Sequence, residues 1–206
     1  MNYLAHLFLA DDDPDSVVGS LMGDFAKGRI DNRLAPAMQW GILMHRKVDA
    51  FTDSHPVVRS SKRRLDDGFR RYGGILVDLF YDHFLAVQWP QYSTVPLEDF
   101  ACDAYRILAG RRVEFPEAMQ RSVSYMVTND LLVSYRTIEG IRQALKGIEG
   151  RLKRPSRLSE AVADLEISYG SLEADFDLFF PALIDYVGEL QRHREEVFPD
   201  LIHTDG

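Results

Sequence analysis

The segment at residues 75–89, ILVDLFYDHFLAVQW, limits the possible folds more than any other part of the sequence. It is apolar on almost every side of a helix, apart from Asp78, Asp82 and His83. A helix with this composition is usually buried. Its acids then need partners, because an uncompensated buried carboxylate costs several kcal/mol, on the order of its desolvation penalty. The segment therefore predicts a buried helix whose polar groups meet partners inside the protein.

The apolar residues of the remaining chain also recur at helical spacing. Helices are expected at residues 16–27, with Gly28 as the stop, at 37–51, from Pro56 to the Gly73–Gly74 pair, and at 75–89, 97–110, 116–135, 138–152, 157–169 and 172–198, the last with a kink at Pro181. No alternating apolar and polar run is long enough to indicate a sheet. A length of 206 residues suits one domain. We therefore predict an all-α, single-domain helical bundle over residues 1–206.

Charge and cysteine content exclude several classes of function. The net charge of −8 disfavours general attraction to nucleic acid or to an anionic membrane. No uncharged stretch approaches the roughly 18 residues that span a bilayer. The one cysteine, Cys102, excludes a disulfide framework and an all-cysteine metal site. The first residues lack the basic region of a signal peptide, so we expect a cytoplasmic protein.

Polar side chains interrupt two apolar helical stripes. Met38, Ile42, His45 and Asp49 step by four, three and four residues, so an apolar stripe ends in a histidine and a carboxylate. Imidazole and carboxylate groups inside a helix bundle suit a divalent ion such as Mn²⁺, Fe²⁺, Zn²⁺ or Mg²⁺. His6, near the start of the sequence, is a further candidate ligand, and the alternative is a histidine that is hydrogen-bonded in the core or exposed at the surface.

Two further carboxylates leave the same choice open. Asp24 continues the stripe of Val17 and Leu21, and an ion pair with a buried Lys or Arg is the alternative to a metal there. Asp78 lies one helical turn before Asp82, where it suits a supporting carboxylate as well as a ligand.

Four segments together resemble the acyl carrier protein phosphodiesterase family, which is similar to a divergent branch of the HD-domain metal-dependent phosphohydrolases. They are MNYLAHLFLA, GSLMGDFAKG, GILMHRKVDAFTDSHPVV and RRYGGILVDLFYDHFLAVQW, within about the first ninety residues. The resemblance implies an HD-like fold and hydrolysis of the phosphodiester that links phosphopantetheine to a serine of holo-acyl carrier protein. It also implies a divalent metal, Mn²⁺ or Mg²⁺, held by Asp24, His45, Asp82 and His83, although an ordinary HD motif has the reverse order of the last two.

Other side chains suit the remaining chemistry of a phosphodiester. His6, Asp49 and His55 are expected to orient the attacking water or to protonate the leaving alkoxide. Arg46 could hold phosphate oxygens.

The carrier protein is acidic, which predicts a basic docking face on this chain. Residues 57–72 carry six cations, including Lys62 and Arg63, against two anions. Residues 142–157 carry six cations against Glu149. We favour the first face, because it adjoins the expected metal site.

Two other functions remain open from the sequence. One is an HD-type phosphohydrolase that acts on a nucleotide or a small phosphoester. The other is a helical module that binds the carrier protein without catalysis. Motifs of serine hydrolases, P-loop NTPases and dinucleotide-binding proteins are absent from the sequence.

Overall fold

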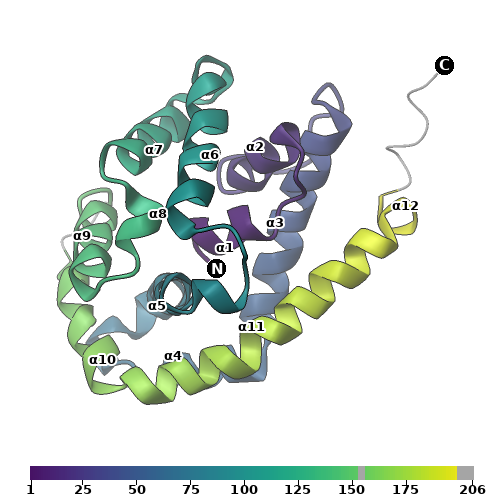
Figure 1. Ribbon diagram of the computed structural model, residues 1–206. Coiled ribbons are helices and arrows are strands. Elements are labelled where there is room, and N and C mark those ends of the chain that lie inside the picture. The colour runs from purple at the N-terminus through teal and green to yellow at the C-terminus, as the bar shows by residue number, and fades with distance from the viewer. Residues whose placement is uncertain (153–155, 199–206) are drawn as a thin grey trace.

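A computed structural model describes residues 1–152 and 156–198, which form helices and their connections with no strand among them (Figure 1). The all-α prediction is therefore confirmed. The α-helices are α1 (Tyr3–Phe8), α2 (Pro14–Met22), α3 (Pro36–Ser54), α4 (Pro56–Arg63), α5 (Gly73–Val87), α6 (Leu97–Gly110), α7 (Glu117–Thr128), α8 (Leu131–Ser134), α9 (Ile138–Glu149), α10 (Val162–Ile167), α11 (Tyr169–Arg192) and α12 (Arg194–Val197). Short 3₁₀ helices cover Asp67–Tyr72, Trp89–Gln91, Arg112–Glu114 and Leu158–Ala161.

Helix α5 is the buried centre that its composition predicts. Leu76, Phe80, Phe84 and Leu85 are fully buried, as is Asp82. The short α1 packs against both α5 and α2, and the long α11 runs past α3, α4 and α5 (Figure 1). None of the described helices combines the length and the apolar composition that a membrane crossing requires.

Helices α2 and α3 cross with almost no side chain between them. A Cβ atom added at Gly19 would lie 2.2 Å from the Met38 carbonyl oxygen, and one at Gly41 would lie 2.4 Å from the Ser16 carbonyl oxygen. Any larger residue at either position would push the helices apart. The backbones themselves therefore fix how the middle of α2 lies against the first turns of α3.

The structure differs from the sequence predictions at several helix boundaries. Helix α2 ends at Met22 instead of Lys27, so Asp24 lies in a turn outside the helix. The helix expected at residues 116–135 is broken, because Asp130 has a φ of 43° and no regular helix continues through such a residue. Pro181 lies inside α11, which continues on both sides of it. The sequence reading did not identify α1.

Candidate metal centre

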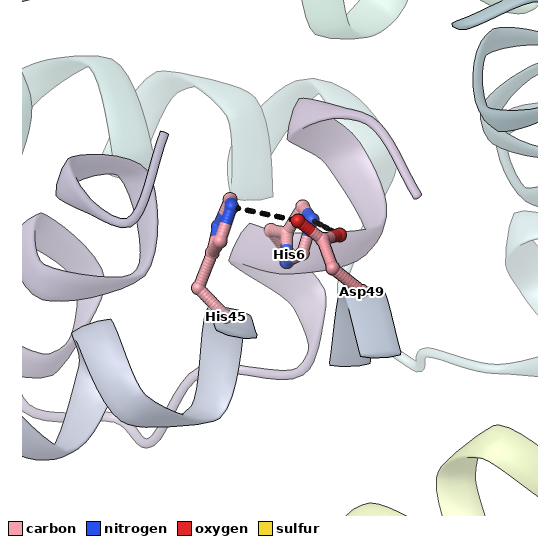
Figure 2. Close-up of side chains that lie close together, drawn as sticks. All are labelled: His6, His45 and Asp49. Carbon is pink, nitrogen blue, oxygen red and sulfur yellow. Dashed lines mark hydrogen bonds and ion pairs between the residues drawn. The ribbon is translucent and has the colours of Figure 1, made fainter. Parts of the chain in front are cut away.

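Two histidines and one aspartate meet where α1 faces α3. His6 Nε2 lies 3.1 Å from Asp49 Oδ1, and His45 Nε2 lies 3.2 Å from Asp49 Oδ2 (Figure 2). The two imidazole rings are stacked, with centroids 3.8 Å apart. His45 and Asp49 are one turn apart in α3, so the stripe predicted from the sequence points at α1. We call His6, His45, Asp49 and the adjacent Asp24 the His–Asp cluster.

Asp24 completes the cluster from the turn after α2. Its Oδ1 lies 3.4 Å from His45 Nε2, and 47% of its side chain is exposed. Gly23, the preceding residue, lies directly against the imidazole, because a Cβ added there would be 2.2 Å from His45 Cγ. The absence of a side chain at Gly23 therefore allows Asp24 to reach the ring nitrogen.

The two histidines of the cluster differ in pKa, because carboxylates act on His45 and burial dominates at His6. Burial disfavours the charged form of His45, but Asp24 and Asp49 outweigh it and raise its pKa to about 9. Burial lowers the pKa of His6 to about 4, so its ring is neutral at pH 7. Asp49 is also partly buried, yet its bonds with both histidines hold its pKa well below the usual range. Without a metal, the cluster is thus a cationic His45 between two carboxylates.

The donor set fits a divalent metal ion. His45 Nδ1–H donates to the Ser20 carbonyl oxygen at 2.7 Å, which leaves Nε2 as the nitrogen that faces Asp24 and Asp49. Ligand histidines typically fix their second nitrogen in this way. The ligand atoms of His6, His45 and Asp49 lie within 4.8 Å of one another, and two ligands of one ion lie at most about 4.2 Å apart. Small shifts would therefore close these three residues around an ion.

One side of the cluster is open to solvent and the other is closed. His6 and His45 are 4% exposed, whereas 43% of the Asp49 side chain is exposed. The carboxylate side can therefore admit water or a phosphate group. The imidazole side is buried, which strengthens electrostatic interactions there.

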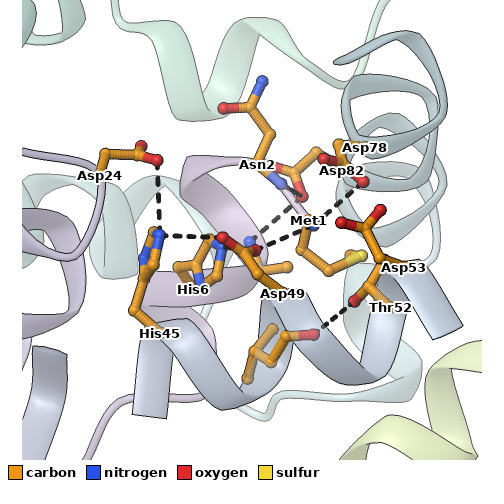
Figure 3. A network of polar contacts seen from close by, with 12 residues as sticks. Met1, Asn2, His6, Asp24, His45, Asp49, Thr52, Asp53, Asp78 and Asp82 are labelled. Atoms are coloured by element: carbon orange, nitrogen blue, oxygen red, sulfur yellow. Dashed lines mark hydrogen bonds and ion pairs between the residues drawn. The ribbon is translucent and has the colours of Figure 1, made fainter. Parts of the chain in front are cut away.

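A wider polar network connects the cluster to α5 through the Met1 amino group (Figure 3). The Met1 amino group lies 3.1 Å from Asp78 Oδ1 and 3.7 Å from Asp49 Oδ1. Lys62 on α4 binds Asp53 at 2.9 Å. Burial raises the pKa of Asp78, and the nearby cations Met1 and Lys62 oppose that rise. Lys62 therefore joins α4 to the end of α3 and acts on Asp78 through its charge.

Asp82, expected as a ligand, instead holds the start of α1. Its carboxylate accepts backbone N–H bonds from Leu4 at 2.8 Å and from Asn2 and Ala5 at 3.3 Å. These donors would otherwise lack partners at the first turn of a helix. Burial raises the pKa of Asp82 to about 7, and the bonds from Leu4 and Ala5 oppose this shift. Backbone groups thus engage both carboxylate oxygens of Asp82, and its expected role as a metal ligand stays a prediction.

His83, the other expected ligand on α5, has both ring nitrogens engaged elsewhere. Nδ1–H donates to the Tyr135 carbonyl oxygen at 2.7 Å, and Nε2 accepts from the Tyr169 hydroxyl at 3.0 Å. Burial lowers its pKa, so the ring is neutral. The need for a partner, which the sequence indicated, is met by a carbonyl and a hydroxyl, and His83 as a metal ligand stays a prediction.

Of the expected catalytic and binding residues, His6 and Asp49 lie in the cluster, and the others make contacts outside it. His55 lies at the end of α3, where its ring packs against Phe51 and Phe179 rather than within the cluster. Arg46 donates from Nη2 to the Ala26 carbonyl oxygen at 2.6 Å. Arg63 is exposed on α4.

Two cations of the second basic segment pair with neighbouring acids. Arg142 pairs with Glu139 at 3.3 Å, and Arg157 approaches Glu160 at 3.5 Å. Two of its other cations, Lys153 and Arg154, lie outside the described residues.

Sequence reasoning missed the supporting contacts of the cluster. The carbonyl of Ser20 has no signature in a sequence. Gly23 did have a signal, because GSLMGDF places two glycines four residues apart, where one helix face can approach a neighbour closely. Read in this way, the spacing would have predicted a close crossing beside Asp24.

Comparisons with known proteins extend the resemblance beyond the first ninety residues. A family model described as acyl carrier protein phosphodiesterase matches residues 1–183. A protein of that name from Escherichia coli O6:H1 (strain CFT073) is 33% identical over 186 residues, covering 90% of this chain and 96% of the relative. One from Escherichia coli O157:H7 (strain EC4115) is 34% identical over 185 residues, covering 89% and 96%. No solved structure matches. The chain belongs to the acyl carrier protein phosphodiesterase family.

Proposed function

We propose that the chain is a metal-dependent phosphodiesterase that hydrolyses the phosphopantetheine–serine bond of holo-acyl carrier protein. The products are apo-acyl carrier protein and phosphopantetheine. The family membership supports the substrate. The observation that carries the proposal is the meeting of two imidazoles with two half-exposed carboxylates, since this arrangement can hold an ion and leave room for a phosphate.

We assign the metal to the His–Asp cluster, with Mn²⁺ as the proposed ion and Mg²⁺ or Fe²⁺ as alternatives. His6 and His45 would supply nitrogen donors, and Asp24 and Asp49 would supply oxygen donors. A bound ion of this kind lowers the pKa of a water toward ~7 and neutralises a phosphate oxygen. This assignment takes His6 and Asp49 into the ligand set, in place of Asp82 and His83.

The residues around the cluster supply the remaining needs of hydrolysis. One bond forms between a water oxygen and phosphorus, and the bond from phosphorus to the serine oxygen breaks. The exposed oxygens of Asp24 and Asp49 can accept hydrogen bonds from the attacking water. The serine oxygen takes up a proton as it leaves, and one hydrogen of the attacking water stays on the new phosphate monoester while the other is released as a proton. His55 as the proton donor remains a prediction, since its ring lies among aromatic side chains at the end of α3.

Helix α4 is the proposed docking face for the acidic carrier. Arg59 and Arg63 are exposed one turn apart, and Lys62 on the same helix binds Asp53, one turn after Asp49 in α3. Arg64 is engaged elsewhere, because its Nε binds the buried Asp175 at 2.9 Å. Docking on Arg59 and Arg63 would bring a prosthetic group of the partner close to the metal.

The activity is tested by incubating purified protein with holo-acyl carrier protein and Mn²⁺. The intact mass of the carrier should fall by the mass of phosphopantetheine minus one water. Replacing Mn²⁺ by Mg²⁺ or Fe²⁺ identifies the ion that supports the fastest reaction. Carrier binding without a change in mass would favour the non-catalytic module, and hydrolysis of small phosphoesters alone would favour the other phosphohydrolase.

Docking is tested by the double variant Arg59→Glu/Arg63→Glu. We expect its KM for the carrier to rise about ten-fold, with a weaker dependence on salt, because rim charges mainly govern association. Hydrolysis of bis(p-nitrophenyl) phosphate should stay unchanged. The matched control Arg142→Glu/Lys146→Glu applies the same charge reversal to α9, and an equal effect there would argue against α4.

A further inference from the structure

Asp24 differs from the rest of the His–Asp cluster because it does not lie on a helix. It belongs to the connection between α2 and α3, residues 23–35. Its only ion-pair partner among the described residues is His45, at 3.4 Å. A half-exposed carboxylate on a connecting segment is free to turn into solvent, so something else must hold it over the ring.

Side chains of α3 hold this connection at two separate points. Near its start, Arg46 Nη2 donates to the Ala26 carbonyl oxygen at 2.6 Å. Near its end, Gln39 Nε2 donates to the Leu34 carbonyl oxygen at 2.7 Å. Only the Arg46 contact lies within two residues of Asp24. The two contacts therefore hold different parts of the same connection.

The Arg46 contact ties a short hydrogen-bonded turn to α3 next to His45. The N–H groups of Phe25 and Ala26 both bond to the Met22 carbonyl oxygen, at 2.9 and 2.8 Å. The turn is thus tied to the last residue of α2 at one end and to Arg46 at the other. Arg46 directly follows His45 in α3, so the guanidinium fixes the turn relative to the ring that Asp24 must reach.

We propose that Arg46 is a positioning residue that holds Asp24 in place for the divalent ion, rather than a ligand for phosphate. The inference rests on the proposed metal site. A carboxylate that is already in place loses little conformational freedom when an ion binds, so removal of its support weakens binding. Partners that orient metal ligands typically change metal affinity about 10–100-fold.

The test measures Mn²⁺ binding by calorimetry in the absence of substrate, which separates the ion from turnover. Arg46→Met retains most of the apolar stem and removes the donor. We expect it to weaken Mn²⁺ binding about ten-fold, with the helical circular dichroism unchanged. Arg46→Lys keeps one donor group and should recover part of the loss. Should Arg46→Met fail to fold, Arg46→Lys carries the test, with an intermediate loss expected.

A double-variant cycle distinguishes positioning from a separate role. If Arg46 acts through Asp24, then Arg46→Met/Asp24→Asn should bind Mn²⁺ no more weakly than Asp24→Asn alone. Gln39→Ala, at the far end of the connection, and Lys47→Met, which removes a neighbouring charge, should bind Mn²⁺ like the unmodified protein.

Three results would overturn the inference. The effects of Arg46→Met and Asp24→Asn could multiply, the control variants could weaken binding as strongly, or Arg46→Met could raise KM for a small phosphodiester while Mn²⁺ affinity stays unchanged. The last result would indicate that Arg46 binds the phosphate of the substrate. Failure of the unmodified protein to bind any divalent ion would instead refute the proposed metal site itself.

Discussion

His45 and His83 are both buried histidines, but the groups that face their Nε2 atoms differ in charge. Both rings are almost fully buried, and both donate from Nδ1 to a backbone carbonyl oxygen at 2.7 Å. The Nε2 of His45 faces two carboxylates, which favour a proton or a metal ion. The Nε2 of His83 accepts a hydrogen bond from a tyrosine hydroxyl, which favours the neutral ring.

The difference shows what separates a site from a satisfied core group. At His83 every polar atom finds its partner within the protein, so nothing more is needed. At His45 two negative groups converge and some positive charge must lie between them. Burial alone does not distinguish the two histidines. The charge of the group that faces Nε2 does.

The largest expected effect comes from a matched pair of substitutions, His45→Asn and His83→Asn. In each variant the amide can still donate to the backbone carbonyl, so only Nε2 is lost. His45→Asn should reduce hydrolysis of holo-acyl carrier protein by about 10³-fold or more, because the ion and its activated water are lost together. His83→Asn should retain most of the activity, as measured by the mass of the carrier.

The stability of the protein should nevertheless depend on His83. His83→Asn should lower the free energy of unfolding by about 1–3 kcal/mol, as expected when a buried hydrogen bond is broken. Denaturant titration of both metal-free variants measures this change. Loss of turnover in His83→Asn with normal stability would place His83 at the reacting centre and end the distinction.

The same comparison can be made between two carboxylates, the buried Asp82, which accepts N–H bonds from α1, and the half-exposed Asp49 of the cluster. Asp82→Ala leaves three N–H groups of α1 without their acceptor and should lower the free energy of unfolding by about 3 kcal/mol. Asp49→Ala in the metal-free protein should cost less, because Asp49 is half-exposed to water. Urea unfolding of both variants without metal provides the comparison, and a larger loss for Asp49→Ala would contradict it.

The two histidines should also give opposite dependences of stability on pH in the metal-free protein. The pKa of His45 rises from 6.5 to about 9 on folding. Its contribution is therefore complete below pH 6.5 and is lost as the pH rises toward 9. After screening of the half-exposed carboxylates, we expect about 1–2 kcal/mol. The pKa of His83 falls on folding, so its contribution is lost as the pH drops below 6.5.

Unfolding curves between pH 5 and 9, compared with those of the two asparagine variants, isolate each contribution. The alkaline loss should disappear in His45→Asn and persist in His83→Asn. A profile that is identical in all three proteins would show that neither ring changes its pKa on folding.

The smallest effect is expected at Tyr169. Tyr169→Phe removes the hydroxyl that donates to His83 Nε2, and water can reach this half-buried position instead. We expect a loss of about 1 kcal/mol in the free energy of unfolding. Activity and Mn²⁺ affinity should be unchanged. A change in Mn²⁺ affinity would link His83 to the metal after all.

Much of the helical architecture follows from local pattern, and helix α6 begins and ends where the spacing of its apolar residues predicts. The pairing of His45 with Asp49 was also readable, since both lie on one helical stripe. Helix α1 was not, because six residues give too short a pattern for a 3.6-residue repeat to be recognised. The predicted relation to HD-domain proteins remains a prediction.

The proposed metal ligands include His6 and Asp49 where the sequence analysis expected Asp82 and His83, and this difference does not come from a short or weak pattern. The sequence showed correctly that the polar groups of α5 are buried and need partners. It could not show which partners, because the N–H groups of α1 and the carbonyl of Tyr135 come from distant parts of the chain. Every residue type carries such backbone groups, so they leave no trace in a sequence.

The capping of α1 by Asp82 sets the order in which the site can be built during synthesis. All four residues of the His–Asp cluster lie within the first 49 residues, yet the carboxylate that holds α1 comes 33 residues after Asp49. At translation rates of about 5–20 residues per second, this separation takes roughly 2–7 s. During that interval α2 and α3 can already cross, while α1 lacks its acceptor. We therefore expect a nascent chain to acquire affinity for the ion only after α5 has been made.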